Sequence, residues 1–111
     1  MAEDAPVLVL VTFGGPEEAR SFANAAVSRQ LAACVNLFPQ VESIYLWKGG
    51  VERAEEVAGV IKTTRHRLEE LEACYRALHS YEVPEFLILP VDGGSPDYLK
   101  WLRGSVSGGE G

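Results

Sequence analysis

Two short segments made almost wholly of large apolar residues restrict the fold of this chain most strongly. They are residues 7–13 (VLVLVTF) and 86–91 (FLILPV). A short apolar run without polar alternation is typical of a strand that is buried on both faces of a sheet. Because exposed apolar surface costs about 25 cal/mol per Å², both faces of these two strands need a cover.

The segments around these strands show helical and extended patterns. Apolar residues at three- and four-residue steps predict a helix over residues 16–31 that begins at Pro16, and a second helix after Thr64, which is a plausible N-cap. Residues 33–38 and 41–47 read as strand, and Pro39 between them belongs at a sheet edge or a bulge. A last short helix is expected from residues 95–97 to Gly104.

Residues 51–64 fit two structures by local pattern. Apolar residues at helical spacing and the Glu-rich start favour a helix, whereas the β-branched residues near Ile61 and a turn centred on Gly49-Gly50 favour a returning strand. If they form a strand, the order is β-α-β-β-α-β plus a terminal helix. That order predicts an α+β ferredoxin-like sandwich, with four antiparallel strands and two helices on one face.

Two helices leave the second face of such a sheet open. The terminal helix is too short to cover it, so we expect another copy of the chain to do so; the alternative is a monomer that tolerates an apolar patch. Within the chain, residues 1–6 read as a loose leader, 7–103 as one domain and 104–111 as a flexible tail.

The charge and the cysteine content narrow the partners and the compartment. Ten Lys and Arg against sixteen Asp and Glu give a net charge of −6, which argues against nucleic acid or an anionic membrane as a partner. The start of the chain lacks the pattern of a signal peptide, and no apolar run is long enough to span a membrane. With only two cysteines, the chain suits a reducing, cytoplasmic setting.

Catalytic motifs are absent from the sequence. No glycine pair has the pattern of a phosphate loop, and no Ser sits in a nucleophile elbow, so we expect a protein that is not an enzyme. His79 and Glu85 are the candidate metal ligands, because an imidazole and a carboxylate six residues apart on an extended loop can face one ion. The alternative is a surface histidine and a solvated glutamate.

Five segments, in order and spacing, resemble the CutA divalent-cation tolerance family. They are residues 31–36 (LAACVN), 43–49 (SIYLWKG), 60–64 (VIKTT), 79–85 (HSYEVPE) and 98–102 (YLKWL). The resemblance implies a ferredoxin-like homotrimer, similar to PII signalling proteins, that is associated with tolerance to copper and other divalent cations. It also implies that residues 52–64 are the second strand of a hairpin.

The resemblance implies part of a copper site. The family's site uses a cysteine near the end of the first strand, a histidine from a pair ahead of the Tyr, and the glutamate after the Pro. Glu85 and His79 match, but Leu78 stands in place of the first histidine, the Val11-Thr12 region has no cysteine, and Ser80 replaces the usual proline. Copper or another divalent cation is therefore the expected cofactor, with an incomplete set of ligands.

Three functions follow as hypotheses. The first is a non-enzymatic trimer that acts in metal tolerance and binds divalent ions weakly near His79 and Glu85. The second is a PII-like sensor with a small ligand in clefts between subunits, and the third is a scaffold for protein partners. Charged and aromatic residues that suit such a cleft, or that alternatively pack at the trimer interface, are Lys62, Tyr45, Trp47, Tyr98 and Trp101.

Overall fold

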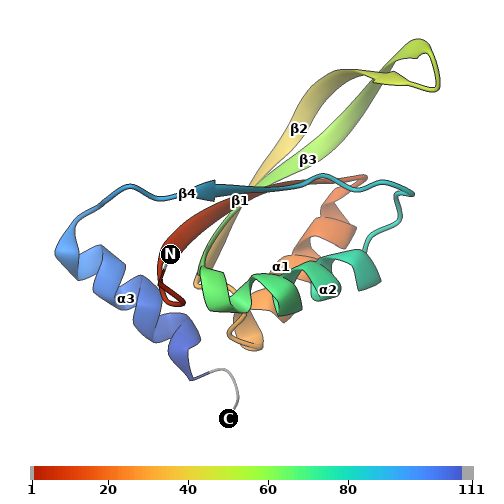
Figure 1. Ribbon diagram of the computed structural model, residues 1–111. Helices are drawn as coiled ribbons and strands as arrows, with labels where there is room; N and C mark the ends of the chain where they lie inside the picture. Colours follow the sequence, from red (N-terminus) through yellow and green to blue (C-terminus); the bar gives the residue numbers. More distant parts are fainter. Residues whose placement is uncertain (1, 109–111) are drawn as a thin grey trace.

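The computed structural model describes residues 2–108, which form an α+β sandwich with one four-stranded sheet (Figure 1). Two helices cover one face of the sheet, as the apolar pattern predicted. The elements in chain order are β1 (Pro6–Phe13), α1 (Pro16–Ser28), β2 (Cys34–Trp47), β3 (Gly50–Thr64), the 3₁₀ helix η1 (Arg65–Arg67), α2 (Leu68–Ala77), β4 (Phe86–Pro90) and α3 (Pro96–Ser107). The predicted β-α-β-β-α-β order with a terminal helix is confirmed.

The two apolar strands lie side by side, β1 inside the sheet and β4 at one of its edges. The strand order is β2-β3-β1-β4 and every pair is antiparallel, with Val9 of β1 opposite Ile61 of β3 and Ile88 of β4. β2 is an edge strand, and its register shifts between Phe38 and Val41. Pro39 lies within that shift, because a residue without an N–H interrupts the ladder least at an edge or a bulge.

Residues 51–64 belong to a strand, so β2 and β3 form a long hairpin that projects beyond the rest of the sheet (Figure 1). The predicted turn centre, Gly49-Gly50, is wrong by one residue. Trp47 pairs with Gly50, and the central residues are Lys48 and Gly49, with φ values of 51° and 85°. A two-residue turn with positive φ at both positions matches the twist of its strands, and Gly50 is already part of the ladder.

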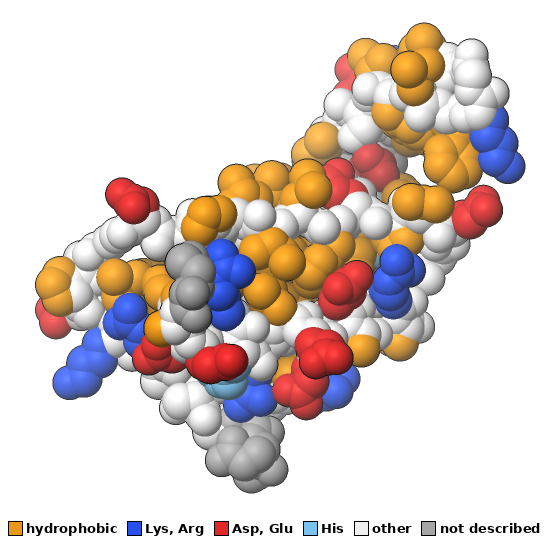
Figure 2. Space-filling view, viewed as in Figure 1, with side chains coloured by type: hydrophobic (Ala, Val, Ile, Leu, Met, Phe, Trp, Pro, Cys, Tyr) orange, Lys and Arg blue, Asp and Glu red, His pale blue; other side chains and the backbone are white. Residues whose placement is uncertain are grey.

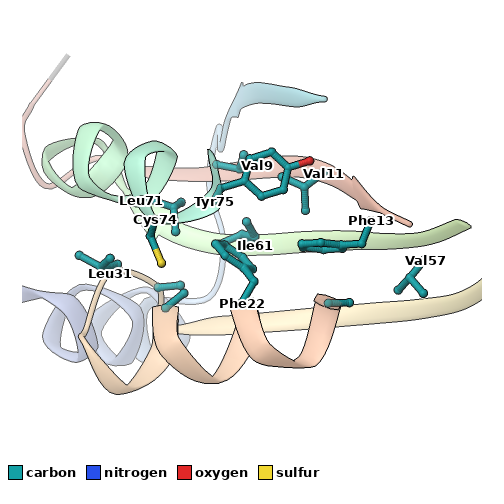
Figure 3. Packing of buried hydrophobic residues seen from close by; sticks show 13 residues of the cluster. Val9, Val11, Phe13, Phe22, Leu31, Val57, Ile61, Leu71, Cys74 and Tyr75 are labelled. Atoms are coloured by element: carbon teal, nitrogen blue, oxygen red, sulfur yellow. The ribbon is translucent and has the colours of Figure 1, made fainter. Parts of the chain in front are cut away.

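The core fills the space between the sheet and the two helices (Figure 3). Alternate residues of β1 point into it, because successive side chains of a strand face opposite sides. Phe13 is in ring contact with Phe22 of α1 and with Tyr75 of α2. Side chains at the centre of the core are Val9, Val11, Phe13, Ala19, Phe22, Ala26, Ile61, Leu71 and Tyr75.

The other face of the sheet remains open over most of its area. Leu10 of β1 faces it together with its register partner Leu87 of β4, which is 56% exposed. Figure 2 shows hydrophobic side chains along the sheet and at the end of the hairpin. α3 reaches only the end of this face, where the Tyr98 ring lies 6.0 Å from the Nζ atom of Lys62. The two helices therefore leave an uncovered apolar surface, as the sequence predicted.

Two of the predicted helix ends are wrong. α1 stops at Ser28 rather than at residue 31, because Gln30 adopts a φ of 60° and the Leu31 N–H bonds back to the Ala26 carbonyl. α3 continues through Gly104 to Ser107, because Val106 behind the glycine is completely buried. The first residues of the predicted tail are thus helical, and residues 109–111 lie outside the described part.

The residues before β1 are attached to η1. The N–H of Arg65 donates to the Ala5 carbonyl at 3.0 Å, and the N–H of His66 donates to the Glu3 carbonyl at 2.8 Å. His66 itself is exposed, as expected. The first described residues are therefore hydrogen-bonded to the start of η1.

Candidate functional site: an acidic pocket at the base of the hairpin

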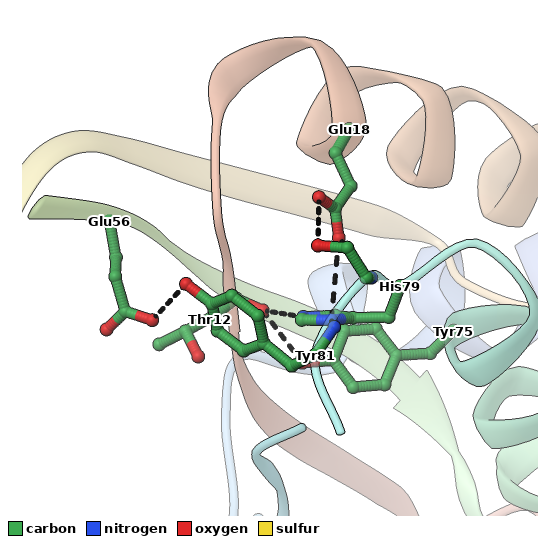
Figure 4. Close-up of polar contacts among 7 residues, drawn as sticks. Thr12, Glu18, Glu56, Tyr75, His79 and Tyr81 are labelled. Carbon is green, nitrogen blue, oxygen red and sulfur yellow. Dashed lines mark hydrogen bonds and ion pairs between the residues drawn. The ribbon is translucent and has the colours of Figure 1, made fainter. Parts of the chain in front are cut away.

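The loop that joins α2 to β4 crosses the end of β1, and His79 anchors it there (Figure 4). The His79 side chain is fully buried and stacks on the Phe13 ring at 5.6 Å. Further along, Val83 precedes Pro84, and this keeps the backbone extended toward β4. The histidine is therefore a packed residue, whereas Glu85 at the end of the loop is exposed.

Both ring nitrogens of His79 are engaged. Nε2 lies 2.6 Å from the carbonyl oxygen of Thr12, and Nδ1 accepts the N–H of Tyr81 at 3.0 Å. A carbonyl oxygen only accepts hydrogen bonds, so Nε2 carries the proton and Nδ1 is the acceptor. The ring thus binds the end of β1 on one side and its own loop on the other.

Glu18, in the first turn of α1, also forms hydrogen bonds with this loop. Its carboxylate accepts the N–H of Ser80 at 3.1 Å and the Ser80 hydroxyl at 3.0 Å, and it lies 3.4 Å from Nδ1 of His79. A carboxylate is favourable in the first turn of a helix, where backbone N–H groups are unpaired. The loop is therefore fixed from two elements, β1 and α1.

Two tyrosines complete the network. The Tyr75 hydroxyl donates to the Thr12 carbonyl at 2.8 Å, and the Tyr81 hydroxyl donates to Glu56 at 2.7 Å. Burial raises the pKa of both phenols above the ordinary value, and the hydrogen bond to Glu56 raises that of Tyr81 further. Both hydroxyls thus remain protonated donors at neutral pH.

A pocket of about 680 Å³ opens between this loop and the base of the β2–β3 hairpin. Among the described residues, its wall includes three carboxylates, Glu56, Glu82 and Glu85, and no Lys, Arg or His. Its aromatic residues are Tyr45, Trp47 and Tyr81. The site is therefore acidic and aromatic, which suits a positively charged ligand.

The structure separates the two residues that were predicted to bind metal. Glu85 lines the pocket, whereas His79 is buried behind its wall with both nitrogens hydrogen-bonded. Within residues 2–108, no group of three or more His, Cys, Asp or Glu side chains is arranged to hold a metal ion. A metal site at these two residues stays a prediction.

The residues of the predicted ligand cleft fall into two places in one chain. Tyr45 and Trp47 line the acidic pocket. Lys62 and Tyr98 meet at the far end of the open sheet face, where the Trp101 ring lies 5.3 Å from that of Tyr98. One chain therefore does not assemble this set into a single cleft.

Sequence reasoning missed Glu56, Tyr81 and Glu82 as residues of the pocket. Tyr81 and Glu82 belong to the segment 79–85 that was already singled out, so a wider reading of that segment was the available signal. Glu56 had no local signal. It reaches the pocket only through the hairpin register, which pairs it with Val41.

Comparison with known proteins identifies the family. The sequence model of the "CutA1 divalent ion tolerance protein" family matches residues 7–105. The chain belongs to this family. The match covers nearly all of the described CutA1 fold, from β1 into the last helix.

Named relatives agree with this membership. The divalent-cation tolerance protein CutA of Thermus thermophilus is 45% identical over 96 residues, which are 86% of this chain and 93% of that protein. The chloroplastic protein CutA of Arabidopsis thaliana is 43% identical over 100 residues, 90% of this chain and 55% of that protein. The chain spans about half the length of the plant and mouse CutA proteins that it matches.

Solved CutA1 structures share the fold. The divalent cation tolerance protein from Thermus thermophilus superposes with a TM-score of 0.89 at 42% identity, covering 91% of this chain and 98% of that one. CutA1 from Oryza sativa gives 0.88 at 39% identity, covering 95% and 97%. Among the described residues, no helix is long and apolar enough to cross a membrane.

Proposed function

We propose that the protein acts in divalent-cation tolerance without catalysing a reaction, and that it binds divalent ions weakly through Glu85 at the acidic pocket. The observation that carries the proposal is the pocket wall, to which the described part of the chain contributes three carboxylates and no basic side chain. Membership of the CutA1 family supports the same role. An uncompensated negative wall concentrates cations next to it.

Glu85 is the first ligand in this proposal because it is exposed at the pocket. His79 joins it only if the ring gives up the hydrogen bond from Tyr81, which occupies Nδ1. Carboxylate oxygens alone favour hard cations such as Mn²⁺, and an imidazole adds affinity for Cu²⁺. The affinity for copper therefore depends most on whether Nδ1 of His79 gives up its hydrogen bond from Tyr81.

The working unit in this proposal is a homotrimer. The open sheet face supports association, because Leu87 and Leu89 of β4, which face it together with their register partners Leu10 and Leu8, are 56% and 38% exposed in one chain. Further copies are also a source of additional ligands for an ion at Glu85.

We place the protein in the cytoplasm. Relatives include a chloroplastic and a periplasmic CutA. Cell fractionation of the native host is therefore the appropriate check.

Calorimetric titration with Cu²⁺ and Mn²⁺ tests the metal proposal. We expect weak saturable binding by the wild type and its loss in Glu85→Gln, which removes the charge and keeps the shape. Glu69→Gln is the matched control, because Glu69 is an exposed glutamate on α2 outside the pocket. Identical isotherms for the wild type and Glu85→Gln would exclude this site.

The same titration separates the two ions. For His79→Gln we expect weaker binding of Cu²⁺ and unchanged binding of Mn²⁺, because only copper draws on the imidazole. Equal loss for both ions in a folded His79→Gln protein would mean that the histidine acts by positioning the loop, and would remove it from the ligand set.

A further inference from the structure

Glu56 is a buried carboxylate with a neutral partner. It is 8% exposed, and its Oε2 atom accepts the hydroxyl of Tyr81 at 2.7 Å. Within residues 2–108 it forms no ion pair with a Lys, Arg or His side chain. A buried charge is costly unless an opposite charge compensates it, so this carboxylate at the pocket wall is prepared for a cation.

Aromatic residues from two elements surround the same space. Tyr45 and Trp47 come from β2, and Tyr81 comes from the loop that follows α2. The face of an aromatic ring attracts a cation within about 6 Å and also packs against hydrocarbon. The wall therefore offers a contact for both parts of an amine, its charge and its apolar body.

The size of the pocket and the spacing of its carboxylates distinguish this ligand from a bare metal ion. A volume of about 680 Å³ lies in the range of sites for small organic ligands. Within the described residues, the acidic side chains do not converge in a group of three that could coordinate an ion. Dispersed carboxylates around a large aromatic space suit a larger cation that carries an apolar body next to its charge.

We propose that this pocket binds a small organic cation, an amine with an apolar body, whose ammonium group lies at Glu56 and whose hydrocarbon packs against Tyr45 and Trp47. Glu82 and Glu85, both exposed, add negative charge at the pocket. The site goes beyond metal tolerance and has its own anchor, because the proposed divalent ion depends on Glu85 and the amine depends on Glu56.

Phenethylamine and phenethyl alcohol form a matched pair of probes, because they share a body and differ in charge at neutral pH. Saturation-transfer NMR and calorimetry on the full chain measure their binding. We expect saturable binding of the amine that is at least about tenfold tighter than that of the alcohol, the usual scale for a charge-assisted contact. Equal affinities, or no saturable binding of the amine, would overturn the proposal.

Three variants locate the site. Glu56→Gln keeps an acceptor for Tyr81 and should weaken amine binding about tenfold. Tyr45→Leu should weaken it about threefold or more through loss of the ring face, while Tyr98→Leu should not, although Tyr45 and Tyr98 are 43% and 42% exposed. Unchanged binding in Glu56→Gln, or equal loss in the two tyrosine variants, would overturn the assignment.

Metal titrations on the same proteins keep the two proposals apart. The Glu56→Gln protein should bind the amine about tenfold more weakly and keep the wild-type isotherm with divalent ions. The Glu85→Gln protein should lose that isotherm. A wild type that binds Mn²⁺ and not phenethylamine would remove only the amine site. The reverse result would remove only the metal site.

Discussion

The Nε2 atom of His79 lies 2.6 Å from the carbonyl oxygen of Thr12, so the loop after α2 is bonded to the end of β1. The Tyr75 hydroxyl donates to the same carbonyl at 2.8 Å (Figure 4). Two donors on one acceptor fix the position at which the pocket loop begins. The chemistry of the pocket therefore depends on residues that do not line it.

Replacing His79 by alanine should destabilise the protein by about 2–4 kcal/mol. The change removes two buried hydrogen bonds and the stacking on Phe13, and it leaves a cavity. His66→Ala is the matched control and should cost less, because His66 is exposed. Urea unfolding at one fixed protein concentration measures both; equal losses would contradict a special structural role for His79.

Tyr75 should titrate above the ordinary tyrosine pKa of about 10, because burial stabilises its neutral form. In ultraviolet titration at 295 nm, Tyr75→Phe should remove one step that the native wild type shows only at higher pH. Because its pKa is raised on folding, Tyr75 contributes to the free energy of unfolding. That contribution is complete below about pH 10 and is lost as the pH rises through the pKa of the folded state. Loss of an ordinary step near pH 10 instead would contradict the burial effect.

The sequence predicted the sheet because its strongest signals were local. The unbroken apolar runs of β1 and β4 predicted two neighbouring strands, and the helix starts are marked by the fixed φ of Pro16 and by the Ser95 side chain, which accepts the N–H of Tyr98. For residues 51–64 the β-branched pattern and the helical pattern were nearly equal. The resemblance to a family decided in favour of a strand. The last helix was predicted to end at Gly104. That prediction was wrong because burial of Val106 outweighs the low helix propensity of one glycine.

The candidate site was less predictable because its contacts are not local. His79 reads in sequence as an available ligand, and only the fold places Thr12 and Glu18, more than 60 residues earlier, against its ring. Glu56 became part of the pocket through the hairpin register alone. Ser80 likewise donates its N–H to Glu18, which a proline at this position could not do.

Gly59→Ala should destabilise the fold by about 1–3 kcal/mol through overpacking. A Cβ atom at Gly59 would lie 2.9 Å from Cγ2 of Val11 and 3.4 Å from the Phe13 ring, both buried in the core. Gly93→Ala is the control, since no atom lies within 4 Å of its Cβ position. Denaturant midpoints of the two variants measure the difference, and equal midpoints would mean that the core relaxes around the added methyl group.

Leu87→Asp should dissociate the proposed homotrimer while each chain stays folded. Leu87 is 56% exposed and faces the open side of the sheet opposite Leu10, so a carboxylate there would be desolvated only between copies. Val27→Asp is the control, because Val27 is 43% exposed but lies on α1, behind the other face. Light scattering should give three times the chain mass of 12.1 kDa for the wild type and for Val27→Asp, and one chain mass for Leu87→Asp, with unchanged far-ultraviolet circular dichroism. A wild type of 12.1 kDa, or a Leu87→Asp protein that keeps the wild-type mass, would show that this face is not what joins the copies.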